Sequence, residues 1–199
     1  MIIGVINIKG GVGKTTSSLA IATAAQRSGL SVTVVDTDPQ GSATLWAQAA
    51  EDADDPLPFP IVSRNQAEIR RMRERRPDRN GELIVIDTPP NGAVVDEAIK
   101  TADFVVIPTL SSPIDLQQTM LTAAQCQDAG KDYAVLIVMA RKGTNALRAF
   151  RTAVEEYGAG IFDTEIPLRE DFKADFGHTF RSNLNGYEDV WNELRGELR

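Results

Sequence analysis

The stretch "KGGVGKTT", Lys9 to Thr16, follows directly on the apolar segment "MIIGVINI" at residues 1–8. A strand, a glycine-rich loop and a helix in this order form a polyphosphate site, because glycines let successive backbone N–H groups turn toward the phosphates. Such a site also needs a lysine for the β and γ phosphates and a hydroxyl for Mg²⁺. These parts are supplied by Gly10, Gly11, Gly13, Lys14 and Thr15. We therefore predict a nucleotide site here, in preference to a glycine-rich turn without a ligand.

Apolar segments rich in β-branched residues alternate with helix-length stretches along the chain. The segments lie at 1–8, 31–38, 82–90, 103–110 and 133–140, and the expected helices at 15–29, 66–76, 114–130 and 145–158. Segments of this kind are typical of strands buried on both faces, and the alternation implies right-handed crossovers between parallel strands. We predict an α/β fold, with a doubly wound, mainly parallel sheet and helices on both faces. Ligands bind such sheets at the carboxyl ends of the strands.

The composition limits the classes of protein that fit. The chain has 199 residues and a net charge of −7 at pH 7, which argues against uniform binding to nucleic acid, so DNA contact would need a local basic patch. The one cysteine, Cys126, falls in an expected helix, where we predict a buried apolar role. No apolar run approaches the roughly 18 residues of a membrane span. We expect a soluble protein of a reducing cytoplasm.

The loop departs from the strict pattern G-x-x-x-x-G-K-[ST], because Ile8 stands where the first glycine belongs and Lys9 follows it. In this respect "KGGVGKTT" resembles the deviant Walker A motif of the ParA/MinD family of ATPases. The resemblance implies a P-loop NTPase fold, Mg-dependent ATP hydrolysis, and ATP, ADP and Mg²⁺ as ligands. It also implies nucleotide contacts from Lys9, Gly10, Gly11, Val12, Gly13, Lys14, Thr15, Thr16 and Pro167.

Lys9 matches the signature lysine of that family, which reaches across a dimer to the phosphates of the partner's nucleotide. A cation supplied in trans neutralises transition-state charge and can be worth roughly 10³ to 10⁵ in rate. Dimerisation and hydrolysis would then be coupled, with Lys9, Lys14 and Asp38 as catalytic residues. The sequence leaves an alternative open, in which Lys9 only solvates the loop surface or contacts phosphate in its own subunit.

Carboxylates end two of the expected strands. The stretch "VVDTDPQGSAT" places Asp36 and Asp38 on one side of an extended segment, and "IVIDTPP" places Asp87 at a strand end. The resemblance implies that Asp36 would hold the hydration shell of Mg²⁺, that Asp87 would bind the ion through water, and that Asp38 would orient or activate the attacking water. With the hydroxyl of Thr15, these oxygen donors suit Mg²⁺. A β-turn that only terminates the strand is the simpler alternative for "DTDPQ".

Two further stretches, "PTLSSPIDLQQT" and "EIPLREDF", also resemble segments of the family, and the second would form part of the adenine pocket around Pro167. Many members carry an asparagine after the strand that precedes "KGTNALRAF". This chain reads "VMARKG" there, so the resemblance does not extend to base contacts from Met139 to Arg141.

ParA-like members bind DNA without sequence preference, whereas MinD-like members bind membrane, which needs a basic amphipathic terminal helix. The C-terminal stretch carries Val190, Trp191, Leu194 and Leu198 at helical spacing with acidic residues between them, so we expect a helix packed on the sheet and no membrane contact. The basic residues expected to contact DNA are Arg141, Lys142, Arg148, Arg151 and Arg169, with Lys173 and Arg181 as possible extensions. A second basic stretch is typical of a solvated helix face with ion pairs: Arg64, Arg70, Arg71, Arg73, Arg75, Arg76 and Arg79.

These observations predict one ParA-like P-loop ATPase domain over residues 1–199, of the short type without a preceding DNA-binding domain. We expect it to form a homodimer with ATP, to bind non-specific DNA on the nucleoid, and to hydrolyse ATP slowly until a ParB-like or other adaptor protein stimulates it. Its role would be partition of a plasmid or chromosome, or positioning of another cargo. The alternatives are a metabolic P-loop enzyme, such as a ligase or kinase of the dethiobiotin-synthetase type, and a MinD-like membrane-surface ATPase.

Overall fold

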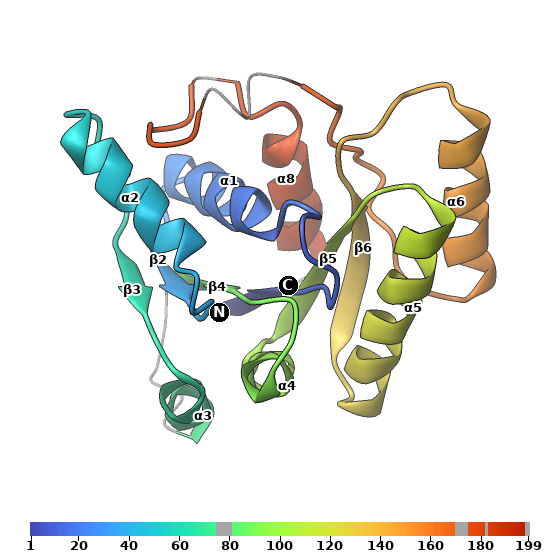
Figure 1. The fold of residues 1–199 in the computed structure, drawn as a ribbon, viewed down its shortest axis with the longest axis horizontal. Helices are drawn as coiled ribbons and strands as arrows, with labels where there is room; N and C mark the ends of the chain where they lie inside the picture. Colours follow the sequence, from blue (N-terminus) through green and yellow to red (C-terminus); the bar gives the residue numbers. More distant parts are fainter. Residues whose placement is uncertain (75–80, 170–174, 182, 198–199) are drawn as a thin grey trace.

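The fold is built around one parallel sheet with β1 near its centre. The structure is a computed structural model that describes residues 1–74, 81–169, 175–181 and 183–197. Within these residues the sheet has the strand order β3-β2-β4-β1-β5-β6, and each neighbouring pair is parallel. The strands are β1 (Ile2–Val5), β2 (Ser31–Asp36), β3 (Ile61–Ser63), β4 (Glu82–Asp87), β5 (Phe104–Thr109) and β6 (Asp132–Ile137) (Figure 1). This order confirms the predicted doubly wound fold.

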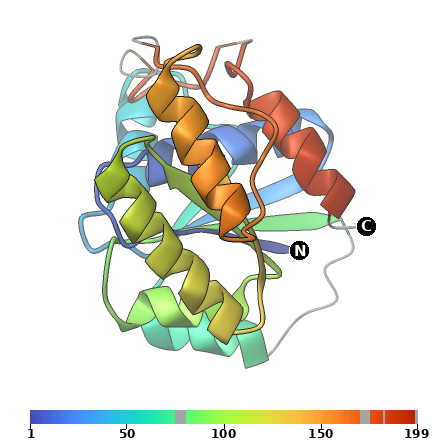
Figure 2. The same ribbon diagram turned by 90° about the vertical axis from the view of Figure 1, so that its right-hand side faces the viewer.

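Helices cover both faces of the sheet. One face carries α1 (Lys14–Arg27), α2 (Ser42–Asp52) and α8 (Tyr187–Glu197), and the other carries α3 (Gln66–Glu74), α4 (Ala93–Thr101) and α5 (Pro113–Asp128) (Figure 1). The helix α6 (Asn145–Glu156) packs beside α5 near the β6 edge (Figure 2). The helices that follow β1 and β2 lie on one face and those that follow β3, β4 and β5 lie on the other, as right-handed connections require when the chain reverses its direction across the sheet once.

Apolar side chains form a core on each face of the sheet. On one face Ile3 and Leu19 pack with Trp191 of α8, and the indole Nε1 of Trp191 donates a hydrogen bond to Ser28 Oγ at 3.0 Å. On the other face Ile86 packs with Cys126 of α5. Burial raises the pKa of the Cys126 thiol to about 12, so it remains a neutral apolar side chain, as the sequence predicted.

The C-terminal helix is also confirmed, because Val190, Trp191 and Leu194 are buried against α1 and the sheet, while Leu198 lies outside the described residues. Among the helices of the described residues, none is long and apolar enough to cross a membrane.

Three elements were not expected from the sequence: β3, α2 and α4. The strand β3 is only three residues long, too short for a periodic pattern, and it forms because the sheet edge at β2 is available to pair with it. Phe59, in the acidic and proline-rich stretch at residues 51–60 that precedes β3, is buried. The last strand ends earlier than expected, at Ile137, and Met139 beyond it has a φ of 51°, outside the strand region.

The core position of Leu19 gives a stability prediction. Leu19→Ala should lower the free energy of unfolding by about 2–5 kcal/mol, because the fully buried side chain leaves a cavity between α1 and the sheet. Urea denaturation followed by circular dichroism measures this loss. The matched control is Leu121→Ala, which makes the same change at a helical position that is half exposed. An equal loss in the two variants would contradict the assigned packing of α1.

Candidate nucleotide-binding site

The loop at residues 8–13 leaves the N-terminus of α1 open. Gly11 and Gly13 have φ values of 75° and 76°, in the left-handed region where side chains are strained. Gly13 is the N-cap of α1, and no side chain there accepts a hydrogen bond from the first turn of the helix. The N–H groups of that turn are therefore available to an anion, which the helix dipole also favours.

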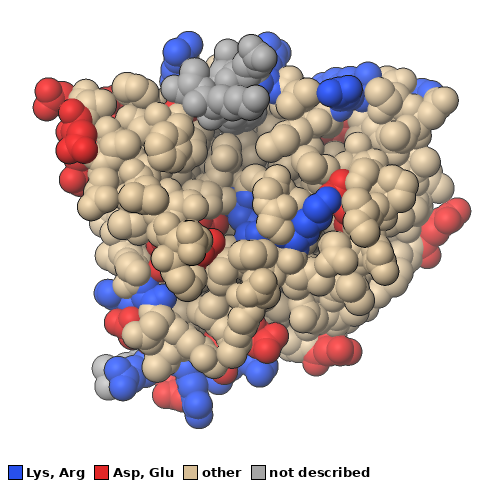
Figure 3. Space-filling model, viewed as in Figure 1, with Lys and Arg blue, Asp and Glu red and all other residues tan. Residues whose placement is uncertain are grey.

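A cavity of about 410 Å³ lies at this helix end. The predicted residues that line it are Gly10, Gly11, Gly13, Lys14, Thr15, Thr16 and Asp38, while Val12 is buried. Figure 3 shows the hollow near the centre of this face, with cationic and acidic atoms close together in it. Thr88, after β4, and Trp46, on α2, complete its walls. The carboxyl ends of the central strands and the open helix end thus face one space.

Lys14 is the lysine directed at this cavity. It is largely buried, and its Nζ donates a hydrogen bond to the backbone oxygen of Lys9 at 2.9 Å. Burial lowers the pKa of Lys14, and attraction by Asp87 and Asp38 opposes part of that lowering. Because the present acceptor is one neutral carbonyl, phosphate oxygens would be stronger acceptors for this ammonium group.

Thr15 and Asp87 meet at the metal corner predicted from the sequence. Thr15 Oγ1 donates to Asp87 Oδ2 at 2.8 Å, and Ser18 Oγ donates to Asp87 Oδ1 at 3.0 Å. Burial raises the pKa of Asp87 to about 7, although the two hydrogen bonds act in the opposite direction. A hydroxyl and a buried carboxylate in contact form an oxygen donor set that fits Mg²⁺, which also retains water ligands. The structure thus brings two of the three predicted metal residues together.

Asp36, the third, has its oxygens engaged elsewhere. Its Oδ2 accepts hydrogen bonds from Thr44 N at 2.9 Å and Thr44 Oγ1 at 2.7 Å, and its Oδ1 accepts one from Asp38 N. Asp36 lies beside Asp87 in the β2–β4 register, so it remains next to the metal corner. The contacts with Thr44 tie the end of β2 to the start of α2.

Asp38 lies in a turn and not in the extended segment expected from the sequence, since β2 ends at Asp36 and Gly41 N donates to Asp38 O at 2.8 Å. The period-two argument therefore does not apply to this pair of carboxylates. The turn nevertheless directs Asp38 to the cavity that Lys14 and Thr15 line.

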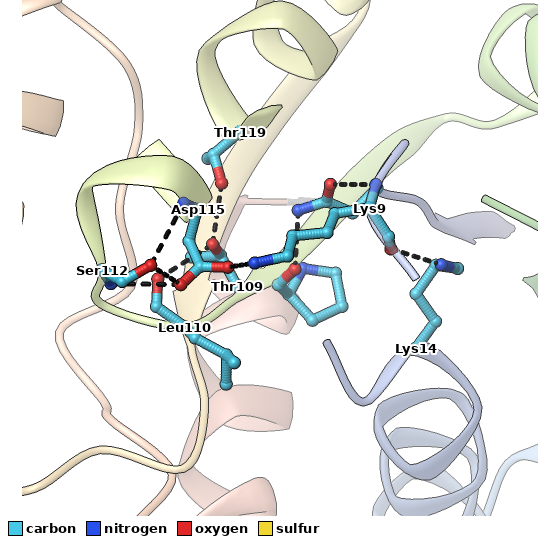
Figure 4. Close-up of polar contacts among 9 residues, drawn as sticks. Lys9, Lys14, Thr109, Leu110, Ser112, Asp115 and Thr119 are labelled. Carbon is cyan, nitrogen blue, oxygen red and sulfur yellow. Dashed lines mark hydrogen bonds and ion pairs between the residues drawn. The ribbon is translucent and has the colours of Figure 1, made fainter. Parts of the chain in front are cut away.

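Lys9 points away from that cavity. Its Nζ forms an ion pair with Asp115 Oδ1 on the first turn of α5 (Figure 4). Lys9 also lines a neighbouring cavity of about 700 Å³ with Asp115, Arg141 and Leu168. Lys9, in the loop, and Lys14, at the start of α1, thus face different spaces. The alternative in which Lys9 contacts phosphate of its own subunit would also require its side chain to leave Asp115.

A small apolar pocket of about 140 Å³ adjoins the loop at Gly13 and Thr16 and contains Pro167. Pro167 is held by a bridge to Ala140, and Ile166, Val138 and Met139 also line the pocket. No base contact was expected from Met139, yet this residue lines both this pocket and the cavity of about 410 Å³. Met139 has a positive φ, which changes the direction of the chain at this residue and which no sequence pattern predicted.

The predicted DNA-contact residues fall into two groups. Arg141, Lys142, Arg148 and Arg169 are exposed, and Figure 3 shows basic side chains along the upper edge, where the β6–α6 loop lies in Figure 1. Arg151 differs, because it forms ion pairs with Glu155, Asp163 and Glu165 and donates to Phe162 O at 3.0 Å. Its charge is therefore largely offset within the subunit.

The remaining basic residues behave differently. Arg181 Nε lies 3.8 Å from Asp175 Oδ1, and Lys173 lies outside the described residues. On α3, Arg70 pairs with Glu74 at the i,i+4 spacing expected of a solvated helix face, and Arg64, which precedes α3, pairs with Glu68. Arg75, Arg76 and Arg79 lie outside the described residues.

Sequence reasoning missed several residues of the site. Ser18 contacts Asp87 from one helical turn after Thr15, so helical spacing could have found it. Trp46 and Phe176, whose ring centroids are 5.4 Å apart, line the main cavity from distant parts of the chain. Trp46 Nε1 donates to His178 O at 3.0 Å, which fastens residues 175–181 to α2. Only the tertiary structure reveals this wall.

The buried Asp87 gives a pH prediction for the metal-free protein. The folded chain keeps the proton up to about pH 7, whereas the unfolded chain releases it near the ordinary value of 3.8, so wild-type stability should fall across that window. Asp87→Asn removes this titration and should gain stability relative to wild type, by on the order of a few kcal/mol, between about pH 4 and pH 8. Urea denaturation in EDTA across pH measures it.

The control for this prediction is Asp128→Asn, the same substitution at an exposed position of α5. Parallel stability curves for wild type and Asp87→Asn across the window would contradict the assigned burial of the carboxylate.

Comparisons with known proteins agree with this geometry. Residues 3–179 match the family described as the CobQ/CobB/MinD/ParA nucleotide binding domain. The maintenance of carboxysome distribution protein A of Gloeobacter kilaueensis is 34% identical over 170 residues, covering 83% of this chain and 76% of that protein.

Two solved structures show the same fold. Cobyrinic acid a,c-diamide synthase from Mycobacterium smegmatis, with bound ADP and magnesium, has a TM-score of 0.74 at 18% identity and covers 99% of this chain and 94% of that one. A variant of McdA from Cyanothece, in complex with ATP, has a TM-score of 0.74 at 16% identity and covers 98% and 96%. The chain therefore belongs to the CobQ/CobB/MinD/ParA family of nucleotide-binding domains, as its first loop led us to expect.

Proposed function

We propose that this protein is an ATP-hydrolysing switch that dimerises with ATP, binds DNA without sequence preference, and positions a plasmid, a chromosome or a protein assembly. The matched family includes metabolic CobQ/CobB members as well as MinD and ParA, so it is the carboxysome-distribution relative that supports a ParA-type role over a metabolic one. The cavity at Gly13 would take the phosphates of ATP, and the pocket at Pro167 would take the base.

The observation that carries this proposal is the divergence of the two lysines. Lys14 faces the cavity of its own subunit, whereas Lys9 faces a neighbouring space and does not line that cavity. A lysine directed outward from a phosphate loop has an evident use if a second subunit brings its own nucleotide opposite. Each subunit would then supply Lys14 in cis and receive Lys9 in trans, so that transition-state charge is neutralised only in the dimer.

The other residues of the site have roles that follow from their places. Lys14 and the open end of α1 would bind the phosphates, and Asp38 at the cavity wall would orient the attacking water. Thr15 and Asp87 would hold Mg²⁺, with Asp36 beside them. When bound, the ion would supply Lewis-acid stabilisation of the phosphate oxygens. Asp36 would also link the metal corner to α2 through Thr44, so that the state of the nucleotide affects this helix.

The basic group of Arg141, Lys142, Arg148 and Arg169 would contact DNA phosphates. A single subunit offers few cations against a net charge of −7, and a dimer presents them twice. Because ATP would favour the dimer, DNA affinity would follow the nucleotide state. The protein would then associate with the nucleoid, and a ParB-like or other adaptor protein would stimulate hydrolysis and release it.

The trans role of Lys9 is tested by comparing it with Lys14. Lys14→Ala should weaken ATP binding by roughly tenfold to a hundredfold, since no ammonium group then donates charge-assisted hydrogen bonds to the phosphates. Lys9→Ala should bind ATP as the wild type does but form no ATP-dependent dimer and show no stimulated hydrolysis. Calorimetry measures the binding, and sedimentation with a hydrolysis-resistant ATP analogue and Mg²⁺ measures the dimer.

Lys100→Ala, an exposed change on α4, is the matched control for both lysine variants. Wild-type dimerisation and hydrolysis in Lys9→Ala would overturn the trans assignment.

The DNA proposal is tested by salt dependence. The double variant Arg141→Ala/Arg148→Ala should bind unrelated duplex DNA more weakly with the ATP analogue, and its log–log salt slope should be lower by about 0.9 for each phosphate that the variant no longer neutralises. Fluorescence anisotropy at several salt concentrations, with ATP analogue, with ADP and without nucleotide, measures this. The control Arg70→Ala lies on α3, at the other end of the sheet (Figure 1). An equal weakening in the control would contradict the assigned surface.

A further inference from the structure

Residues 175–181 form a strap beside α2, near the top of the view in Figure 1. The indole Nε1 of Trp46, on α2, donates a hydrogen bond to His178 O at 3.0 Å. Thr179 N donates to Asp55 Oδ2 at 3.0 Å, and Thr179 Oγ1 donates to Asp55 O at 3.2 Å. The strap is therefore fixed both to α2 and to the loop that follows α2.

Gly177 allows the strap to lie directly against α2. Its φ is 77°, in the left-handed region that favours glycine. A Cβ at this position would lie 2.9 Å from the Cβ of Ala49, closer than two carbon atoms pack. An alanine in place of Gly177 would therefore displace the strap from α2.

An aromatic ring of the strap meets one of α2 at the nucleotide cavity. The ring centroids of Phe176 and Trp46 are 5.4 Å apart, a distance usual for aromatic pairs, and both residues line the cavity of about 410 Å³. Trp46 is buried and also lies against Phe180, with 5.3 Å between the centroids. Phe176 is 54% exposed although it is large and apolar. A ligand that filled the cavity would cover part of this exposed ring.

The same cavity contains the groups that would bind phosphates. Lys14 and Thr15 line it at the start of α1, and Asp38 lines it from the turn after β2. Burial lowers the pKa of Lys14, so its ammonium group is already poorly hydrated. The attraction between an ammonium group and phosphate oxygens strengthens as water is excluded, because the effective dielectric constant falls. An apolar surface beside these groups would therefore strengthen phosphate binding.

We propose that Trp46 and Phe176 form an aromatic wall that keeps water from the phosphates of a bound nucleotide, and that the strap holds this wall in place. The inference rests on the proposed binding of phosphates at Lys14 and adds residues that the phosphate loop does not contain. It assigns Phe176 to the phosphates and not to the base, which the pocket at Pro167 would take. Nucleotide affinity would then depend on a segment far from the loop in sequence.

The test is Phe176→Ala, with the binding of Mg-ADP and of inorganic tripolyphosphate with Mg²⁺ measured by calorimetry. ADP avoids hydrolysis, and tripolyphosphate carries phosphates without a base or a sugar. We expect both ligands to bind about threefold to tenfold more weakly than to wild type, the loss usual for one aromatic contact. The difference should increase with salt concentration, because solvent then reaches and screens the lysine–phosphate contact.

Two further variants are the controls for this test. Phe176→Leu keeps an apolar cover over the cavity and should restore most of the affinity for both ligands. Tyr157→Ala removes an exposed aromatic side chain at the end of α6 and should leave both affinities unchanged. Weaker binding of ADP alone would place Phe176 on the nucleoside and overturn the inference, as would unchanged affinity for both ligands in Phe176→Ala.

Gly177→Ala tests the strap without changing either ring. Because the strap would be displaced from α2, the affinity for tripolyphosphate should fall as it does in Phe176→Ala. The double variant should show little further loss, since both changes remove the same wall. Thermal unfolding of each variant shows whether the chain remains folded. Full additivity of the two losses in folded variants would contradict a shared role.

A spectroscopic readout distinguishes this inference from the proposed function. The sequence contains two tryptophans, so Trp191→Phe leaves Trp46 as the one that fluoresces, and its emission should change when Mg-ADP or tripolyphosphate is added. If calorimetry detects binding but neither the emission nor the affinity of Phe176→Ala changes, the inference alone fails. If both change but ATP produces no dimer, the proposed function fails and the wall remains. No binding of either ligand to the wild type would overturn both.

Discussion

The central position of β1 is the constraint on which the rest of the structure depends. Because β1 pairs with β4 on one side and β5 on the other, its C-terminal end opens between the ends of those two strands. The loop at residues 8–13 therefore emerges beside Asp87 of β4 and near Thr109 of β5. The phosphate loop, the metal corner and the start of α5 are neighbours for this one reason.

The site contains several ionisable side chains that are buried, and burial disfavours their charged forms. Asp36 and Asp87 are buried side by side at the ends of β2 and β4, and Lys14 is buried next to them. In the absence of ligand, Thr15, Ser18 and Thr44 supply the hydrogen bonds that make this burial tolerable. A metal ion and phosphates would add the countercharges that the protein alone lacks, which is the electrostatic reason for proposing Mg-ATP as the ligand.

Lys9 would supply positive charge to the nucleotide of another subunit, as Lys14 would to the nucleotide of its own. In the unpaired chain both lysines interact with acceptors within the same chain. Lys14 donates a hydrogen bond to the backbone carbonyl of Lys9, and Lys9 forms an ion pair with the carboxylate of Asp115. By our proposal, nucleotide phosphates would compete for both lysines, in cis for the first and in trans for the second. A nucleotide would thus replace an internal set of contacts by an intermolecular one, and this replacement can make assembly depend on ATP.

The sequence by itself determined the fold class and the identity of the phosphate loop. Its glycine pattern, the strand before it and the carboxylates that end "VVD" and "IVID" are local signals, readable because backbone conformation and strand ends depend on neighbouring residues. The sequence did not announce the short strand β3, which exists only by pairing with β2. It also could not show that Asp38 reaches the cavity through a turn, or that Lys9 forms an ion pair with Asp115, 106 residues away. Nor could it show that Arg151 forms ion pairs within the subunit, with Glu155, Asp163 and Glu165. The contact of Lys9 with Asp115 is fixed by the packing of α5 on β5, and those of Arg151 with Asp163 and Glu165 by the path of the chain after α6. These arrangements do not follow from neighbouring residues alone, so only the tertiary structure decides them.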